Sequence, residues 1–328
     1  MSTSLTRPTE LSTHPDDNFH PPKDDDPFWT ETCWWTFFVP ERRLSGQLYP
    51  FFRTNQNVAA CAVYLWNDEG DQFHTALYAR QTWHLPLPDQ PLTDITLPNG
   101  LHYRCLEPRT SYELQYRDPD GEDVGVDLRF DAVLEPNHDG HGHLDQPGRI
   151  TGTIRLDGED IAVDCYGLRD RSWGRRGGFG KNIIKHGGHN AGYCYATASP
   201  EQAFHLLAFD KGKGRCEVVH GYHVQDGEFA KLTRGVREVL DRDAAGNPTH
   251  VRIDAEDALG RPLQVEGRCV NAFGLLLNPN IWCINCLTEW TWNGNTAWGE
   301  DHDNWTPYGY RRFFRAFHGY RDALTLPS

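Results

Sequence analysis

The sequence predicts an all-β protein made of antiparallel sheets, with a short helix near its C-terminal end. Three observations support this fold class: apolar side chains alternate with polar ones over many short runs, turn sequences separate the runs, and one segment has helical spacing. The composition agrees, because 11 Trp, 13 Tyr and 16 Phe residues stand beside 31 Gly, 21 Pro and one Met. Aromatic residues favour strands, while Gly and Pro favour the turns between them. We therefore expect an antiparallel sandwich or barrel around an aromatic-lined interior.

Hairpins are the clearest of the predicted elements. Apolar and polar residues alternate over residues 112–116 and again over 124–130, and the turn sequence DPDG lies between the two runs. The same pattern joins residues 150–156 to 161–165 through an Asp-Gly pair, which is typical of a two-residue hairpin turn. Further strand pairs are separated by the turn sequences SPEQ, QDGE and DALG, at residues 199–202, 225–228 and 257–260.

A helical pattern is found near the C-terminus. Tyr310, Phe313, Phe314 and Phe317 follow the i, i+3, i+4, i+7 spacing of an amphipathic helix. The chain as a whole is acidic, with a net charge of −14. We therefore interpret this helix as one that docks on the sheets rather than on a membrane surface.

Three parts are expected along the chain. Residues 1–27 are rich in Pro, Thr and Asp, and we expect them to form a flexible N-terminal arm. The glycine-rich stretch GRRGGFGKNIIKHGGHN, residues 174–190, interrupts the strand pattern and indicates a domain boundary. Residues 28–176 would then form an N-terminal β domain, and residues 177–328 a C-terminal β domain that includes the helix.

Charge and cysteine content narrow the choice of partners and compartment. The net charge of −14 argues against nucleic acid and anionic membranes, and no run of about 18 apolar residues is present to cross a bilayer. The N-terminal residues lack the apolar core of a secretory signal, and the nine cysteines are scattered without a disulfide framework. We therefore expect a cytoplasmic protein with reduced thiols and a small-molecule ligand, and the sequence leaves a homodimer open.

Cofactor motifs are missing from the sequence. It contains no P-loop, Rossmann fingerprint, G-x-S-x-G or H-E-x-x-H pattern. Cys283 and Cys286 have CxxC spacing, but a strand would place their thiols on opposite faces. The sequence HDGHGH, residues 138–143, is interpreted as a flexible loop between hairpins because of its Gly and Asp content. The sequence therefore predicts neither a metal nor a nucleotide cofactor.

The segment GRITGTIRLDGEDIAVDCYGLRDRSWGRR, residues 148–176, resembles the signature of the carotenoid 1,2-hydratase (hydroxyneurosporene synthase) and AttH-like superfamily. It is most similar to uncharacterised bacterial relatives with the pattern G-x-R-D-x-S-W-G-x-R. The resemblance implies two lipocalin-like antiparallel β-barrels or half-barrels packed together, with the motif at their junction. It also implies cofactor-free chemistry, since the superfamily includes hydratases of isoprenoid double bonds, and fungal pericyclases resemble it in architecture. Relatives commonly have His where this chain has Arg171, so this protein either does different chemistry or takes its proton donor from another place.

The motif itself contains several candidate site residues. If the strand continues through it, Asp170 and Ser172 lie on one face. The other face then carries Arg169, Arg171 and Trp173. In a hydrophobic pocket the pKa of Asp170 would rise, so we expect a catalytic acid there, with turn capping or ion pairing as the alternative. The arginines are expected to clasp the two lobes and line the pocket wall, and Trp173 is either a core ring or a pocket wall facing a developing cation.

Other candidates follow the motif along the chain. His186 and His189 lie in the glycine-rich junction loop and are candidate acid–base residues. Tyr195 and His205 are also candidate catalytic residues. If their face of the strands points into the barrel, they join Tyr222 in a polar cluster inside an aromatic cavity. A hydrogen-bonded core network is the alternative.

These residues lead to a functional prediction. Trp282 and His302 complete the expected substrate-binding wall, although the GEDHDNW sequence around His302 also fits a solvated turn. We expect a cofactor-independent acid–base enzyme of the hydratase, dehydratase or isomerase type. Its substrate would be a hydrophobic terpenoid, polyketide or aromatic molecule, bound in a pocket at the domain junction. The alternatives are a non-catalytic carrier of a hydrophobic ligand, and a pericyclase that preorganises its substrate.

Overall fold

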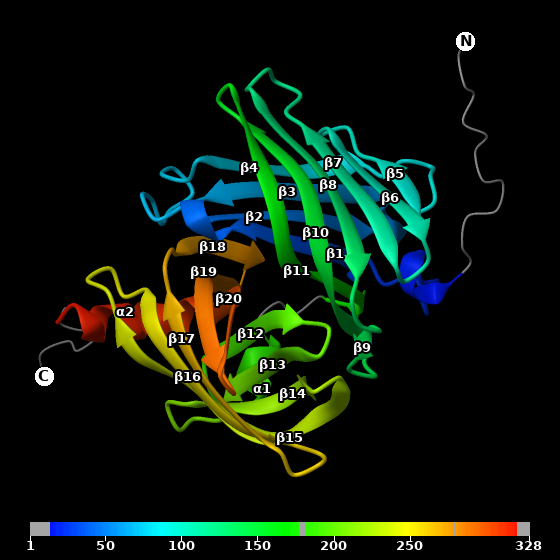
Figure 1. The fold of residues 1–328 in the computed structure, drawn as a ribbon. Coiled ribbons are helices and arrows are strands. Elements are labelled where there is room, and N and C mark those ends of the chain that lie inside the picture. Colours follow the sequence, from blue (N-terminus) through cyan, green and yellow to red (C-terminus); the bar gives the residue numbers. More distant parts are fainter. Residues whose placement is uncertain (1–13, 177–180, 279, 320–328) are drawn as a thin grey trace, which may run out of the picture.

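The computed structural model describes residues 14–176, 181–278 and 280–319, and it places two antiparallel sheets against each other (Figure 1). Within the described residues, the first sheet has eleven strands in the order β4-β3-β2-β1-β11-β10-β8-β7-β6-β5, with β9 paired to β10. It curves into a half-barrel, which we call the first lobe. Its strands are β1 (Trp29–Val39), β2 (Leu44–Arg53), β3 (Val58–Trp66), β4 (Tyr78–Pro86), β5 (Asp94–Thr96), β6 (Leu101–Glu107), β7 (Ser111–Arg117), β8 (Val124–Ala132), β9 (Asn137–His138), β10 (His143–Leu156) and β11 (Glu159–Arg175).

The second sheet closes on itself and forms the second lobe. Strand β17 pairs with both β16 and β19, which makes a closed eight-stranded barrel, and β18 extends it at the edge of β19. Its strands are β12 (Asn190–Ser199), β13 (Gln202–Asp210), β14 (Cys216–Gln225), β15 (Glu228–Arg242), β16 (Pro248–Asp257), β17 (Pro262–Cys269), β18 (Phe273–Asn278), β19 (Ile281–Trp292) and β20 (Asn295–Trp305).

The helical elements are short. Three 3₁₀ turns and two α-helices are found among the described residues: η1 (Pro15–Asp17), η2 (Pro40–Arg42), η3 (Thr54–Gln56), α1 (Lys181–Lys185) and α2 (Pro307–Phe317). Helix α2 is the predicted C-terminal helix, and it begins at an N-cap, where the Thr306 hydroxyl accepts a hydrogen bond from the amide of Gly309. Its apolar stripe docks on the barrel, since Phe313 stacks on Trp305 with ring centroids 5.0 Å apart. No helix in the described part of the chain is long and apolar enough to cross a bilayer.

The all-β, two-lobed prediction is confirmed, and the predicted hairpins are present. Strands β10 and β11 form the longest of them. Asp157 and Gly158 both have positive φ, at 48° and 87°, as a type I′ turn requires. The chain passes from the first sheet to the second between Arg175 and Asn190.

The structure does not place Tyr195 and His205 inside the barrel, so the interpretation of a polar cluster within its cavity is wrong. Small and apolar side chains fill the interior of the second lobe, including Cys194, Ala196, Phe204 and Leu206. Because side chains alternate along a strand, Tyr195 and His205 point out of the barrel. They face the first lobe, where the hydroxyl of Tyr195 donates a hydrogen bond to Thr36 at 3.1 Å.

The sequence predicts a flexible arm over residues 1–27. Residues 1–13 lie outside the described residues, and residues 14–27 do not form such an arm, because they pack against the first lobe. The carboxylate of Asp17 is fully buried in the first lobe, 2.9 Å from the guanidinium of Arg169. The carboxylate of Glu31 lies at the same distance from Arg171, which also donates to the carbonyl of Asn18. Both buried guanidiniums therefore depend on the first lobe and the segment before it, and they do not clasp the two lobes as predicted.

Candidate active site between the lobes

A row of polar side chains crosses the first sheet on the face that meets the second lobe. Trp34 on β1 lies opposite Asp170 on β11, and Asp170 lies opposite Asp145 on β10. Two residues further along the same pair of strands, Ser172 on β11 is opposite His143 on β10. Since residues i and i+2 share a face of a strand, these side chains project together toward the second lobe.

A glycine allows the chain to enter β10 close to β11. Gly142 has a φ of +96°, and a Cβ at this position would lie 2.3 Å from the carbonyl oxygen of Trp173. Only glycine fits this approach without strain. It places His143 directly over the end of the R-D-R-S-W motif.

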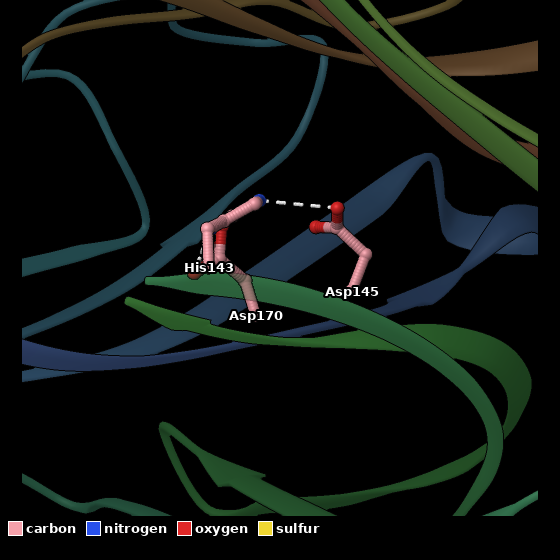
Figure 2. A group of neighbouring side chains, drawn as sticks. All are labelled: His143, Asp145 and Asp170. Carbon is pink, nitrogen blue, oxygen red and sulfur yellow. Dashed lines mark hydrogen bonds and ion pairs between the residues drawn. The ribbon is translucent and has the colours of Figure 1, made fainter. Parts of the chain in front are cut away.

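His143 links the two carboxylates of the cluster. Its Nε2 lies 3.0 Å from Oδ2 of Asp145, and its Nδ1 lies 2.7 Å from the hydroxyl of Ser172. Nδ1 is also 3.7 Å from Oδ1 of Asp170. Figure 2 shows the three side chains of His143, Asp145 and Asp170 on the same side of the two strands. A cationic imidazole donates from both nitrogens, so it suits this position between acceptors.

Burial and mutual charge separate the acid strengths of these three groups. Burial raises the pKa of Asp170 to about 6; the charge of His143 opposes this rise and that of Asp145 adds to it. Burial alone would lower the pKa of His143, but the carboxylates of Asp145 and Asp170 raise it to about 10. Burial also works against ionisation of Asp145, yet the charge of His143 lowers the pKa of Asp145 below its usual range. At neutral pH the cluster holds a His143–Asp145 ion pair beside a carboxyl group close to its own midpoint.

The second lobe adds two side chains to Asp145. The hydroxyl of Tyr193 donates to Oδ1 of Asp145 at 2.5 Å, and Nε2 of His205 lies 3.5 Å from Oδ2. Burial lowers the pKa of His205 to about 4, with Asp145 opposing this and neighbouring histidines adding to it. His205 is therefore a neutral imidazole at the base of the cluster.

A second set of contacts joins the lobes beside the cluster. Thr36 donates its hydroxyl proton to Glu300, whose other oxygen lies 2.7 Å from Nε2 of His302. The ring of His302 stacks on Tyr193 at 5.3 Å, and the ring of Trp34 meets both of them edge-on. These rings form an aromatic wall next to the carboxylates.

Burial differs among the side chains of the cluster. The side chains of Asp145 and His205 are fully buried. Those of His143 and Asp170 keep 18% and 17% of their surface exposed. The carboxyl group of Asp170 is therefore partly accessible to solvent.

Five predicted residues belong to this junction, and six do not. The junction contains Asp170, Tyr195, His205, Tyr222 and His302. The residues outside it are Arg169, Arg171, Trp173, His186, His189 and Trp282. The two arginines lie on the core face of the first sheet, as the period of two predicts for neighbours of Asp170.

Each of the other excluded residues packs against its own surroundings. Trp173 stacks on His20 with ring centroids 3.9 Å apart. The ring of His186 stacks on Phe209, with ring centroids 4.3 Å apart, and not on any residue of the cluster named above. The two remaining residues contact helix α2 or its N-cap: His189 hydrogen-bonds to Thr306, and Trp282 packs on Tyr310.

His143, Asp145 and Tyr193 were missed from the sequence, and only the first two have a signal in it. A two-residue turn at 157–158 pairs residue 156 with 159, and continuing this register places Asp145 opposite Asp170. The Gly and Asp residues before His143 predict a loop there, but β10 begins at His143. Tyr193 could not be linked to Asp145, because no local pattern predicts contacts between separate sheets.

The three donors of His143, Asp145 and Asp170 lie within 4.8 Å of one another, a spacing that could suit a metal ion. However, His143 already uses Nε2 on Asp145 and Nδ1 on Ser172. A metal would have to displace one of these bonds. The cluster is complete as an ion pair with a neighbouring acid, and the absence of a metal cofactor stays a prediction.

A half-barrel packed on a closed barrel is also found in solved structures, in agreement with the fold that the resemblance of residues 148–176 implies. Solved structures of the same fold include a candidate AttH from Nitrosomonas europaea, with 14% identity, a TM-score of 0.63, and coverage of 92% of this chain and 98% of that one. Kievitone hydratase from Nectria haematococca shares 12% identity, with a TM-score of 0.54 and coverage of 84% and 89%. CghA shares 13% identity, with a TM-score of 0.56 and coverage of 85% and 89%.

The family of this chain follows from a comparison of its sequence with family models. The model of the domain of unknown function DUF7064 matches residues 13–306, so the chain belongs to this family. No protein with curated function matches the chain. At identities of 11–14%, the structural likeness establishes the fold alone.

Proposed function

We propose that this protein is a cofactor-independent acid–base enzyme of the hydratase, dehydratase or isomerase type. Its substrate is a hydrophobic small molecule of terpenoid, polyketide or aromatic character that binds between the lobes. One observation carries the proposal: Asp170, a partly exposed carboxyl group, lies beside the buried His143–Asp145 ion pair at the lobe junction. Carboxyl groups with raised pKa values are suited to donate protons near neutral pH.

Asp170 is the proton donor in this mechanism. In a hydration, its carboxyl proton moves to one carbon of the substrate double bond, and the other carbon becomes cationic. Water then bonds to that carbon and returns a proton to the Asp170 carboxylate. In a dehydration the same proton goes to the leaving hydroxyl group, and a substrate C–H proton later restores the acid. Each cycle regenerates Asp170, so no other reagent is needed.

His143 and Asp145 hold the acid in place and set its strength. The imidazolium of His143 is fixed between Asp145 and Ser172, and the hydroxyl of Ser172 also lies 3.4 Å from Asp170. Asp145 is fully buried and fixed in turn by Tyr193 of the second lobe. These contacts make the geometry rigid, as general acid catalysis requires.

The aromatic wall of Trp34 and Tyr193 supports a cationic intermediate. A π face stabilises positive charge, and the effect grows when water is excluded. The fold agrees with this chemistry, since kievitone hydratase has the same architecture and is named for a hydration. The resemblance of residues 148–176 to cofactor-free hydratases gives further support.

The test is a search for turnover by mass spectrometry. Wild-type protein and Asp170→Asn are incubated with metabolite extract of the source organism in ¹⁸O-labelled water, with and without EDTA. Asp164→Asn is the matched control, because Asp164 lies on the same strand with an exposed side chain paired to Arg149. We expect a product that gains labelled oxygen or loses water with wild type and Asp164→Asn, unaffected by EDTA, and absent with a folded Asp170→Asn.

Two outcomes would overturn the proposal. Full turnover by folded Asp170→Asn would remove Asp170 from the mechanism. An extract component that stays bound and unchanged in wild type and both variants would indicate a carrier instead.

A further inference from the structure

Two buried polar side chains beside the cluster lack hydrogen-bond partners within the described structure. Both ring nitrogens of His205 and the hydroxyl of Tyr222 are in this position. The two residues are 0% and 1% exposed, so bulk water does not satisfy them. They lie directly opposite each other on β13 and β14, with ring centroids 5.7 Å apart. Buried polar groups are normally hydrogen-bonded, so two unsatisfied neighbours point to a missing polar partner.

Besides Asp145 and His220, apolar side chains and rings surround this pair. The ring of Tyr222 stacks on Phe229 at 5.3 Å, and Leu134 of the first lobe packs against it. The ring of Tyr193 meets His205 edge-on at 4.7 Å. A molecule that satisfies the two polar groups would therefore be mostly hydrophobic around its polar atom.

Charge determines which polar atom fits. His205 is neutral, because burial lowers its pKa to about 4. Its nearest charged neighbour is Asp145, whose Oδ2 lies 3.5 Å from Nε2. A carboxylate or phosphate would meet like charge from Asp145, and burial of an anion without pairing is costly. Lys231 lies across from Tyr222 on β15, but it is exposed and donates to the carbonyl of His138. An uncharged oxygen can accept from an N–H or from the tyrosine hydroxyl without this cost.

We propose that His205 and Tyr222 form a subsite that binds an uncharged oxygen of the substrate: a phenol, an alcohol or a carbonyl. This inference rests on the proposed function of the junction, and it narrows the substrate to oxygenated hydrophobic molecules rather than plain hydrocarbons, carboxylates or phosphates. Asp145 connects the subsite to the acid, since it contacts His143 at 3.0 Å and His205 at 3.5 Å. Both histidines contact the same oxygen, Oδ2, of Asp145.

The experiment uses three small probes of similar shape: phenol, toluene and benzoate. The full chain is labelled with ¹⁵N in its imidazole rings, and the His205 signals are followed by NMR during titration at pH 7. We expect phenol to shift these signals saturably, and toluene and benzoate to bind at least about tenfold more weakly, as the loss of a buried hydrogen bond predicts. Tyr222→Phe, which removes one oxygen atom, should weaken phenol about tenfold as well. His186→Phe, outside the junction, should leave phenol binding unchanged.

Equal binding of phenol and toluene would overturn the subsite, as would phenol binding unaffected by Tyr222→Phe. An absence of any saturable shift would also overturn it. The proposed function is judged separately, because Asp170→Asn should bind phenol like wild type whether or not it turns over a substrate. Conversely, turnover of a substrate without oxygen would contradict the subsite and leave the acid–base function in place.

Discussion

Along β11, alternate side chains differ in burial and in ion pairing. Arg169 and Arg171 point into the first lobe, where each fully buried guanidinium has a fully buried carboxylate 2.9 Å away. Asp170, between them in sequence, points to the junction, where its side chain is 17% exposed and His143 lies 3.7 Å away. Charged groups on the core face are paired and closed to solvent. The carboxyl group on the junction face is incompletely paired, which leaves it able to exchange a proton.

The largest effect should come from breaking a pair on the core face. Arg169→Met leaves Asp17 buried without its cation, and we expect a loss of about 3–5 kcal/mol in the free energy of unfolding. Urea unfolding followed by tryptophan fluorescence measures it. Arg149→Met is the control, because Arg149 pairs with Asp164 at the surface, where solvent screens the pair and its contribution to stability is small. Equal losses in the two variants would remove the distinction between the two faces.

On the junction face, activity and stability should respond in opposite ways. Asp170→Asn should reduce turnover at least about a hundredfold, as expected for a lost general acid. Its free energy of unfolding at pH 7 should be unchanged or higher, because burial raises the pKa of Asp170 and so disfavours its charged form. Turnover in labelled water and urea unfolding give the two readings. A large loss of stability would make Asp170 a structural residue like its neighbours.

His143 should make stability depend on pH above neutrality. Its pKa is raised from 6.5 to about 10 by the carboxylates of Asp145 and Asp170, against the effect of burial. A raised pKa means that the stabilisation is fully present below pH 6.5 and is lost as the pH rises through 10. Urea unfolding at pH 6, 8 and 10 should show a steeper decline for wild type than for His143→Gln. Parallel curves would show that His143 is not held as a cation.

The smallest effect should come from the contact between the lobes. Tyr193→Phe removes the hydroxyl that donates to Asp145 at 2.5 Å, and we expect turnover to fall about tenfold. The comparison with Asp170→Asn separates a group that positions the cluster from the acid itself. Steady-state kinetics on the substrate found by mass spectrometry provides the measurement. A loss as large as that of Asp170→Asn would give Tyr193 a direct part in proton transfer.

Much of this fold follows from local sequence patterns. The period of two predicts the strands, Asp-Gly predicts the long hairpin, and alternation correctly places Asp170 opposite in direction to Arg169 and Arg171. The partners of these residues could not be predicted in the same way. Asp17 reaches Arg169 across 152 residues of sequence, and such contacts depend on how whole segments pack.

The candidate site was only partly predictable for the same reason. The register of one hairpin is enough to bring Asp145 opposite Asp170. Tyr193 and His205 join them only because the second lobe turns its outer face toward the first. That orientation depends on which side chains fill the barrel, and small residues such as Cys194 and Ala196 do so here.

The most direct test of the central claim is the titration of Asp170 itself. Protein labelled with ¹³C at the aspartate carboxyl carbons is followed by NMR between pH 3 and 9, with Asp170→Asn to assign the signal. The structure predicts a midpoint near 6 for Asp170, because burial outweighs the attraction of His143. It also predicts a higher midpoint in His143→Gln, which lacks that attraction. A midpoint near 4, the ordinary value for aspartate, would contradict the assignment of Asp170 as the catalytic acid.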